Sequence, residues 1–412
     1  MRILLWHGYL LGGTGSNVYT QSLAREWSRA GHEVVVVCQE RHPELYDLDG
    51  AEVVVPELPG GLLPTFVLDD YEGLEARLLQ DFTPGELGAY VQANAAVLDR
   101  PADLLFANHL LMGGAVAAAT RLRSRVKAHG SELEYSIRGR AELAALARES
   151  LAGVEAVVVG SDHIRRVVAE LVGDVGPVLE VPPGVDVDRF RLEPRDEAFA
   201  ALLAEARLDP PNPANADERL PDDANAERLA EFLAGDRPTV VYFGKLIVNK
   251  GVQLLLEALR GLDARAVIVG FGDYREELEA MAPPDTLFTG PLEHRHLVHL
   301  LPLADAAVVP SIFPEAFGMV AAEAAAAGCP PLVAEHSGLA EIAAGLEEEY
   351  PPHLRHLAAF RSGDVSDLRQ KLAELLALGA ADRAELRAAG RRAVERRWSW
   401  AGVAERLLGP VT

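Results

Sequence analysis

Short apolar runs recur along this chain, and stretches rich in Ala, Leu and Arg separate them. Almost every position within a run is apolar, which is typical of parallel strands that helices cover on both faces. Parallel strands need crossover connections, and the intervening stretches are long enough to supply them as helices. The first series of runs lies at residues 3–6, 34–37, 53–55, 104–107, 126–128, 157–159 and 178–181. We therefore expect an α/β fold that opens with a βαβ unit.

A second series of runs predicts a second sheet. It lies at residues 239–243, 266–269, 286–288, 306–309 and 331–334. The length of 412 residues also exceeds what one ordinary hydrophobic core serves. We expect two Rossmann-like domains, at residues 1–191 and 239–390.

Two further segments lie outside these domains. Residues 192–238 carry several prolines among many acidic side chains, and we expect a surface-exposed linker or insertion with short helices there. Residues 391–412 have the pattern of an amphipathic helix with Trp398 and Trp400 at its centre.

The charge of the chain argues against nucleic acid as a partner. It has 39 Lys and Arg against 62 Asp and Glu, a net charge of -23, and such a surface repels polyanions. Basic clusters do occur, at residues 121–127 and 391–397. We interpret both as solvated faces, with an anionic membrane or a phosphorylated substrate as the alternative.

Cysteine content and hydropathy predict a soluble cytoplasmic protein. Only Cys38 and Cys329 are present, which suggests neither a disulfide framework nor a metal site. The apolar run after Met1 is too short for a signal peptide, and no stretch approaches the length of a bilayer span. We expect no integral membrane segment.

A glycine-rich loop at residues 12–17 separates the first strand from the first helix. Free backbone N–H groups and the positive end of the helix dipole meet at such a turn, so a phosphate or pyrophosphate suits it. Gly13 and Gly15 fit the dinucleotide fingerprint, but Val18 stands where its third glycine belongs. Classical NAD binding is therefore disfavoured.

The most specific motif runs from Ser311 to Glu323. It places Glu315 in a loop and Glu323 inside the following helix, eight residues apart. Gly318 allows close backbone approach, and the helix that starts there presents free N–H groups to a ligand. Gly328, followed by two prolines, predicts the end of that helix.

Two lysines follow the first strand of the second series. Lys245 and Lys250 could neutralise a diphosphate as point charges. Either lysine alone is also explained as a solvated surface residue.

Taken together, these motifs resemble glycosyltransferase family 4, retaining nucleotide-sugar enzymes of the GT-B fold. The resemblance covers nearly the whole chain. It rests on the glycine loop and on residues 31–34, 183–186, 244–251, 270–272, 304–311 and 315–323. It implies two Rossmann-like domains facing across a cleft, with a C-terminal helix that crosses back to the first domain.

The resemblance also implies a donor site. Lys245 and Lys250 match the basic pair that grips the donor diphosphate, although the first is usually arginine. Glu315 lies near the transferred sugar, and Glu323 is placed to hydrogen-bond the ribose. The resemblance implies that the backbone of Leu292 reads the donor base. The remaining implied donor contacts are Gly13, Gly15, Gly272, Phe317, Gly318, Met319 and Val320.

The resemblance implies that four residues are catalytic: His129, Lys245, Lys250 and Glu315. His129 would lie close to the sugar, on the acceptor side. His109 and Asn17 are further candidates for acceptor contacts. The acceptor itself stays open among a small molecule, a glycan and a lipid-linked glycan, and so does the oligomeric state.

The expected reaction moves a sugar from a UDP-, GDP- or ADP-sugar to an acceptor hydroxyl with retention, without a metal or another cofactor. Alternatives are a glycoside phosphorylase or nucleotide-sugar epimerase of the same architecture, or a non-catalytic nucleotide-sugar-binding protein. The intact pair of glutamates with both lysines favours transfer.

Overall fold

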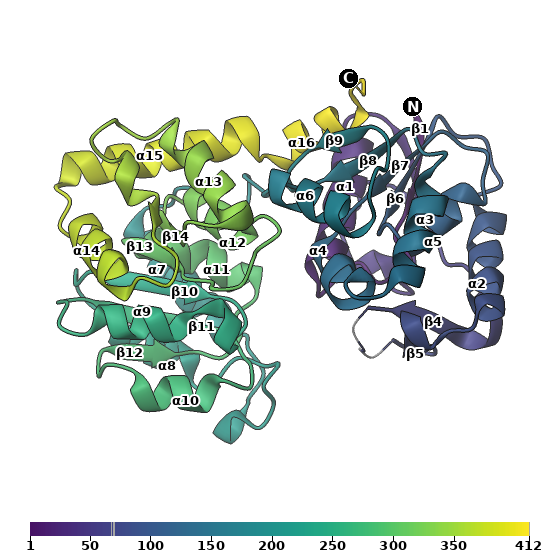
Figure 1. The fold of residues 1–412 in the computed structure, drawn as a ribbon. Helices are drawn as coiled ribbons and strands as arrows, with labels where there is room; N and C mark the ends of the chain where they lie inside the picture. The colour runs from purple at the N-terminus through teal and green to yellow at the C-terminus, as the bar shows by residue number, and fades with distance from the viewer. Residues whose placement is uncertain (67, 69–70, 412) are drawn as a thin grey trace. The chain divides into compact units, whose positions relative to one another are not determined.

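The computed structural model describes residues 1–66, 68 and 71–411. They form two compact units. Unit 1 comprises Met1–Gly184 and the C-terminal residues from Trp400, and unit 2 comprises Val185–Ser399. Each unit is built on a parallel sheet with helices around it, which confirms the predicted fold class (Figure 1).

Unit 1 contains a seven-stranded sheet in the order β3-β2-β1-β6-β7-β8-β9, with every pair parallel. Its strands are β1 (Arg2–Trp6), β2 (Glu33–Val37), β3 (Glu52–Val54), β6 (Leu104–Asn108), β7 (Ser124–Lys127), β8 (Ala156–Val159) and β9 (Val178–Glu180). A separate parallel pair, which the sequence did not predict, consists of β4 (Leu62–Thr65) and β5 (Glu75–Leu78). The helices are α1 (Gly15–Arg29), α2 (Pro84–Val97), α3 (Met112–Ala118), α4 (Gly130–Glu132), α5 (Ala141–Leu151), α6 (Asp162–Leu171) and α16 (Trp400–Leu408).

Unit 2 contains a six-stranded parallel sheet in the order β12-β11-β10-β13-β14-β15. Its strands are β10 (Thr239–Phe243), β11 (Arg265–Val269), β12 (Thr286–Phe288), β13 (Ala306–Val309), β14 (Pro331–Ala334) and β15 (Ala359–Phe360). The helices are α7 (Arg195–Ala206), α8 (Asn225–Phe232), α9 (Val252–Leu259), α10 (Arg275–Met281), α11 (His294–Leu300), α12 (Met319–Ala326), α13 (Ser337–Glu347), α14 (Val365–Leu376) and α15 (Ala380–Arg397).

The acidic segment, residues 192–238, forms helices that pack on unit 2, although many of its residues are exposed. Helix α7 packs on α11, and Leu202 and Leu229 are fully buried in the core of unit 2. The apolar positions of these helices, spaced three and four residues apart, supply the buried face that the acidic composition conceals. Residues 192–238 therefore belong to unit 2, and its first residue is Val185 rather than one near 239.

The C-terminal segment forms two helices rather than one. Helix α15 ends at Arg397 and α16 starts at Trp400. Trp398 packs edge-on against Phe317 in unit 2, whereas Trp400 packs against Tyr19 in unit 1. Because the two tryptophans are buried in different cores, the chain leaves one helix and starts another between them.

The basic cluster at residues 121–127 is a solvated face only in part, because Arg121 and Arg123 are exposed whereas Arg125 and Lys127 are buried. Arg125 is fully buried and donates to the carbonyl oxygens of Leu407 at 2.5 Å and Gly409 at 2.8 Å. Its Nε also pairs with Glu155 at 2.7 Å. A buried guanidinium with its donors satisfied in this way holds the C-terminal end of α16 in unit 1.

No helix in the part of the chain that the structure describes is both long and apolar enough to cross a membrane.

Candidate active site

The candidate donor residues of unit 2 lie in loops that follow neighbouring parallel strands. Lys250 follows β10, Glu315 follows β13 and His336 follows β14. These three strands are adjacent in the sheet, so their carboxyl ends lie at one edge. Ligands of open parallel sheets bind at that edge.

Gly318 sets the start of helix α12. Its φ is +112°, and a Cβ there would lie 2.6 Å from Leu339 Cδ2, so only glycine fits. Met319 and Val320 are the first two helical residues, and their N–H groups have no intrahelical acceptor. This helix start is suited to an anion. At its other end, Gly328 at φ +77° follows the last turn, which confirms the predicted helix end.

Lys250 and Glu315 contact each other. Lys250 Nζ lies 2.5 Å from Glu315 Oε1, and Ser311 Oγ donates to the same oxygen at 2.7 Å. Both partners of the ion pair are partly exposed. The lysine is therefore already directed to the start of the Glu315 loop, where a ligand anion can reach it.

The backbone of Gly251 determines where Lys250 lies. Gly251 has φ +70°, and a Cβ there would lie 2.0 Å from the carbonyl oxygen of Pro310. The N–H of Ile312 donates to the carbonyl of Asn249 at 3.0 Å. Both contacts join the loop after β10 to the loop after β13.

His336 and Ser337 support the Glu315 loop, and sequence reasoning missed both. His336 Nε2 donates to the Ser311 carbonyl at 2.7 Å, which leaves Nδ1 to accept from Ser337 Oγ at 3.0 Å. Ser337 Oγ in turn accepts from the Glu315 N–H at 2.9 Å. Their position directly after a buried parallel strand is the signal that could have found them.

Glu323 is the fifth residue of α12 and is only 7% exposed. Burial raises the pKa of its carboxyl to about 8. Its nearest polar partner is His294 Nε2, at 3.5 Å from Oε1. Among the described residues, no group donates a hydrogen bond to this carboxyl, so it retains its capacity to bind ligand hydroxyls.

His294 was not predicted from the sequence. It starts α11, and its ring lies edge-on to Phe190 at 5.3 Å. Burial lowers its pKa, with Arg189 adding to the effect. A histidine within a run that includes Glu293 and Arg295 gives no periodic signal, because its partner Glu323 lies on a different helix.

The other predicted donor residues of unit 2 differ in their surroundings. Lys245 is exposed. Leu292 is buried in the loop after β12. A Cβ on Gly272 would lie 2.3 Å from the Leu246 carbonyl oxygen, so this glycine permits loop packing. The Phe317 side chain is buried against Trp398, which leaves only its backbone for a ligand.

In unit 1, the glycine loop precedes the start of α1. A Cβ added at Gly13 or at Gly15 would meet no atom within 4 Å, so their backbone faces open space. Asn17 is buried, donates to the Gly12 carbonyl, and its Oδ1 lies 2.8 Å from His7 Nε2. Its polar atoms thus hold the loop and His7, while its contact with an acceptor stays a prediction.

Three histidines of unit 1 lie next to one another, of which His7 and His109 are buried and His129 is half-buried. The ring centroid of His109 is 4.6 Å from that of His129 and 5.5 Å from that of His7. Burial lowers the pKa of His7 to about 4 and holds those of His109 and His129 well below their usual range. All three rings are therefore neutral near pH 7. His7 carries no sequence motif, which is why the sequence did not identify it.

His109 is the least satisfied of the three. It is 2% exposed, its φ is +70°, and neither of its ring nitrogens has a hydrogen-bond partner among the residues that the structure describes. His129, by contrast, has its Nε2 2.9 Å from Asn108 Oδ1. A strained backbone with an unpartnered buried ring is typical of a ligand-binding position.

No group of three or more His, Cys, Asp or Glu side chains within residues 1–66, 68 and 71–411 is arranged to hold a metal ion.

Comparison with known proteins identifies both units. Residues 14–184 match the family described as "Glycosyl transferase 4-like domain", and residues 223–393 match "Glycosyl transferases group 1". Residues 185–222 fall between the two matches.

Two curated relatives are similar over most of their length. The D-inositol 3-phosphate glycosyltransferase of Xylanimonas cellulosilytica is 30% identical over 96% of this chain and 90% of its own. A GDP-mannose-dependent alpha-(1-6)-phosphatidylinositol monomannoside mannosyltransferase of Mycobacterium tuberculosis is 30% identical over 71% of this chain and 69% of its own.

Solved structures share the fold. Alr3699/HepE of Anabaena, in complex with UDP, superposes with a TM-score of 0.69 at 16% identity, covering 99% of this chain and 98% of that one. Sucrose-phosphate synthase of Thermosynechococcus elongatus superposes with a TM-score of 0.63 at 19% identity, covering 98% and 97%.

Proposed function

The chain belongs to glycosyltransferase family 4 of the GT-B fold, and on that premise we propose that it moves a hexose from a UDP-, GDP- or ADP-sugar to an acceptor hydroxyl with retention and without a metal ion. That it is a nucleotide-sugar glycosyltransferase follows from the family and from relatives that are named as such. The observation that carries the finer proposal is the contact between Lys250 and Glu315 beside the start of α12.

In the proposed reaction the donor diphosphate is bound by the ammonium groups of Lys245 and Lys250. It also accepts hydrogen bonds from the N–H groups of Met319 and Val320. Negative charge develops on the diphosphate as the sugar leaves, and preorganised cations and N–H groups stabilise it. The leaving diphosphate helps to take the acceptor proton, so no protein nucleophile is needed. The lysines supply the positive charge that a metal ion would otherwise bring.

Glu323 is proposed to bind the donor ribose, because its buried carboxyl has no hydrogen-bond donor among the described residues. Glu315 is proposed to contact the transferred sugar. When the diphosphate draws Lys250 away, Oε1 of Glu315 keeps its bond from Ser311 and can accept a second one from a sugar hydroxyl.

The acceptor is proposed to bind unit 1 through His109 and His129. Neutral imidazoles both donate and accept hydrogen bonds, which suits a hydroxyl-rich acceptor such as a polyol or a glycan, free or lipid-linked. The X. cellulosilytica relative is named for D-inositol 3-phosphate and the M. tuberculosis relative for phosphatidylinositol monomannoside, which favours a cyclitol-containing acceptor for the first trials. The two free, buried cysteines agree with a cytoplasmic location.

The test is a thermal-shift screen of UDP-, GDP- and ADP-hexoses against the wild type, Lys250→Ala and Glu323→Ala. A donor that binds the native state raises the melting temperature by mass action. We expect one nucleotide class to stabilise the wild type and neither variant. No shift with any nucleotide would contradict the donor site and would favour a phosphorylase or a non-catalytic protein.

A hit is then incubated with candidate acceptors in EDTA, and NMR of the product gives the anomeric configuration. Transfer with retention in EDTA is the expected result. Inversion or a strict metal requirement would contradict the finer proposal while leaving the family assignment unaffected.

A further inference from the structure

The segment before helix α8 contacts the loops that carry the predicted donor contacts Gly272 and Leu292. This segment, residues 209–222, lies between the two family matches. Its last residue, Asp222, is only 4% exposed, although its neighbour Asp223 is exposed. A buried carboxylate needs partners, and those of Asp222 are Arg275 at the start of α10 and Arg228 in α8.

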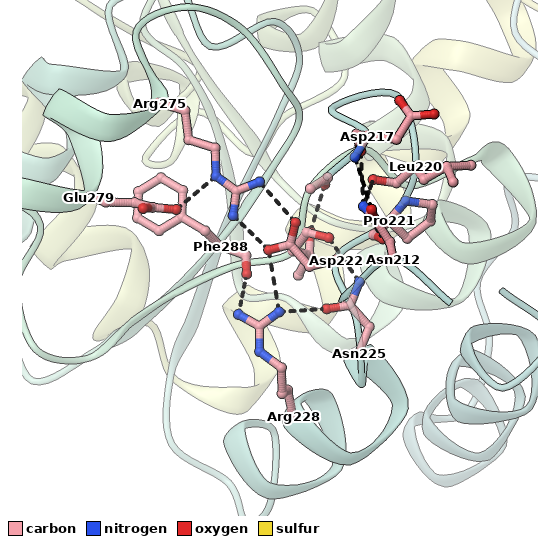
Figure 2. Close-up of polar contacts among 12 residues, drawn as sticks. Asn212, Asp217, Leu220, Pro221, Asp222, Asn225, Arg228, Arg275, Glu279 and Phe288 are labelled. Atoms are coloured by element: carbon pink, nitrogen blue, oxygen red, sulfur yellow. Dashed lines mark hydrogen bonds and ion pairs between the residues drawn. The ribbon is translucent and has the colours of Figure 1, made fainter. Parts of the chain in front are cut away.

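Arg275 holds the side chain of Asp222 by two hydrogen bonds. Arg275 Nη1 donates to Oδ1 at 2.8 Å and Nη2 to Oδ2 at 2.6 Å, and Figure 2 shows this pairing together with Arg228 on the other side of the carboxylate. A bidentate pair of this kind constrains direction as well as distance. Arg275 is three residues beyond Gly272, and its N–H donates to the Gly272 carbonyl at 3.2 Å.

The backbone of Asp222 is joined to the second loop. Its N–H donates to the Thr289 carbonyl at 2.8 Å. A Cβ on Gly290, whose φ is +69°, would lie 2.6 Å from Asp222 Oδ1. Leu292 lies two residues after Gly290. Asp222 therefore lies against the turn that leads to the backbone predicted to read the base.

Helix α8 also contacts the turn after β12. Asn225 Nδ2 donates to the Thr289 carbonyl at 2.8 Å, and Arg228 Nη2 donates to the Phe288 carbonyl at 2.6 Å. Figure 2 shows both side chains directed to this region beside Asp222. The two loops also bond directly, from the Gly270 N–H to the Gly290 carbonyl at 2.9 Å.

The rest of the segment is shaped by Asn212, which is 2% exposed. Its Nδ2 donates to the carbonyls of Asp217 at 2.9 Å and Pro221 at 3.1 Å, and its Oδ1 accepts from the Asp217 N–H at 3.0 Å. These contacts close the loop that places Asp222 against the loops after β11 and β12.

We propose that Asp222 is a positioning residue that fixes the loops after β11 and β12 for the donor nucleobase, and thereby helps to determine which base the enzyme accepts. The inference rests on the proposed donor site. The resemblance implies that backbone groups at Leu292 read the base, so selectivity depends on where that backbone is held. In this chain Asp222, from a segment outside both family matches, holds it together with helix α8.

The test compares Asp222→Asn with Asp223→Asn, its exposed neighbour, as the matched control. Asparagine keeps the shape but turns an N–H group toward Arg275, so the bidentate pair is lost. We expect Asp222→Asn to raise the donor KM about tenfold with kcat at saturating donor nearly unchanged, a uniform-binding signature. We also expect the ratio of kcat/KM between the UDP- and GDP-sugars to change, and inhibition by inorganic pyrophosphate, which has no base, to stay unchanged.

Arg275→Lys provides a second variant if Asp222→Asn fails to fold, because lysine keeps the charge and loses the bidentate fork. The same changes in donor KM and in the base ratio are expected. If the variants lower the melting temperature but leave donor KM and the base ratio unchanged, Asp222 has only a structural role and the inference is overturned. If the wild type itself binds no nucleotide, the proposed donor site fails, and this inference fails with it.

Discussion

Ser337, whose backbone φ is +49°, accepts a hydrogen bond from the N–H of Glu315 at 2.9 Å. A non-glycine residue at such a φ is strained, and strain of this kind persists where the surrounding contacts maintain it. Here those contacts are the bonds to Glu315 and His336, so the conformation of Ser337 and the position of the Glu315 loop depend on each other.

Replacing Ser337 separates the strain from the hydrogen bond. Ser337→Ala loses the bond and keeps the strain, and we expect the free energy of unfolding to fall by about 1–2 kcal/mol. Ser337→Gly loses the same bond but relaxes the backbone, so it should be less destabilising. Urea denaturation measures both. A glycine variant that is as unstable as the alanine variant would contradict the strain at Ser337.

Lys250→Ala is expected to lower kcat by about 100-fold, near 3 kcal/mol of transition-state stabilisation, by analogy with the loss of an oxyanion donor. Lys250→Arg keeps the positive charge and should retain most of the activity. Lys371→Ala, which removes a lysine of α14 that donates to the Ala359 carbonyl, serves as the control. Steady-state kinetics with saturating donor measure kcat of the three variants. An unchanged kcat in Lys250→Ala would exclude a catalytic role for Lys250.

Stability should depend on pH through Glu323. Burial raises the pKa of Glu323 to about 8, whereas an unfolded chain titrates near the ordinary value of about 4.3. Between these values the folded protein holds a proton that the unfolded chain has released. The free energy of unfolding therefore falls as the pH rises through this window, by up to about 1.4 kcal/mol per pH unit.

Glu323→Gln removes this dependence. The stability of the variant relative to the wild type should increase from about pH 5 to pH 8 and change little above it. Chemical denaturation without nucleotide measures this, with the exposed Glu257→Gln as the control. A difference that is independent of pH would show that Glu323 is ionised throughout.

His109→Asn tests the acceptor side. Asparagine tolerates a φ of +70°, so the backbone is retained while the ring and its two nitrogens are lost. We expect the acceptor KM to rise about tenfold with the donor KM unchanged, which indicates loss of binding to the acceptor alone. His42→Asn, at an exposed histidine of the same unit, should change neither constant. A rise in the donor KM instead would show that His109 contacts the donor and would contradict its role in acceptor binding.

Arg125→Met should release the C-terminal helix. The variant leaves the carbonyls of Leu407 and Gly409 and the side chain of Glu155 without their buried partner, so a loss of about 3 kcal/mol in stability is expected. Limited proteolysis should then cut near residue 399 before any other site. Arg123→Ala, which removes an exposed partner of the same Glu155, should have little effect. Equal resistance of Arg125→Met and the wild type would show that other contacts hold α16.

Much of the fold could be predicted from the sequence, because it depends on local patterns. The apolar runs at 239–243, 286–288, 306–309 and 331–334 coincide with β10, β12, β13 and β14. A strand buried on both faces must be apolar throughout, and this leaves a strong signal. The helix end at Gly328 likewise follows from the chemistry of one residue. Lys250 and Glu315 were identified by motif, and the structure adds that they contact each other.

What only the tertiary structure decided concerns residues whose partners are distant in the chain. Arg125 and Asp222 stand in charged stretches that look exposed, and each is buried because a distant segment satisfies its charge. His294 and His336 lie beside Glu323 and Ser311, and His7 lies beside His109, only when the fold brings separate elements together. Periodicity and turn chemistry act over a few residues, so the sequence by itself determined the strands, the helix ends and the family motifs. The pairing of buried polar groups is a long-range property, and it follows only from which elements the folded chain sets side by side.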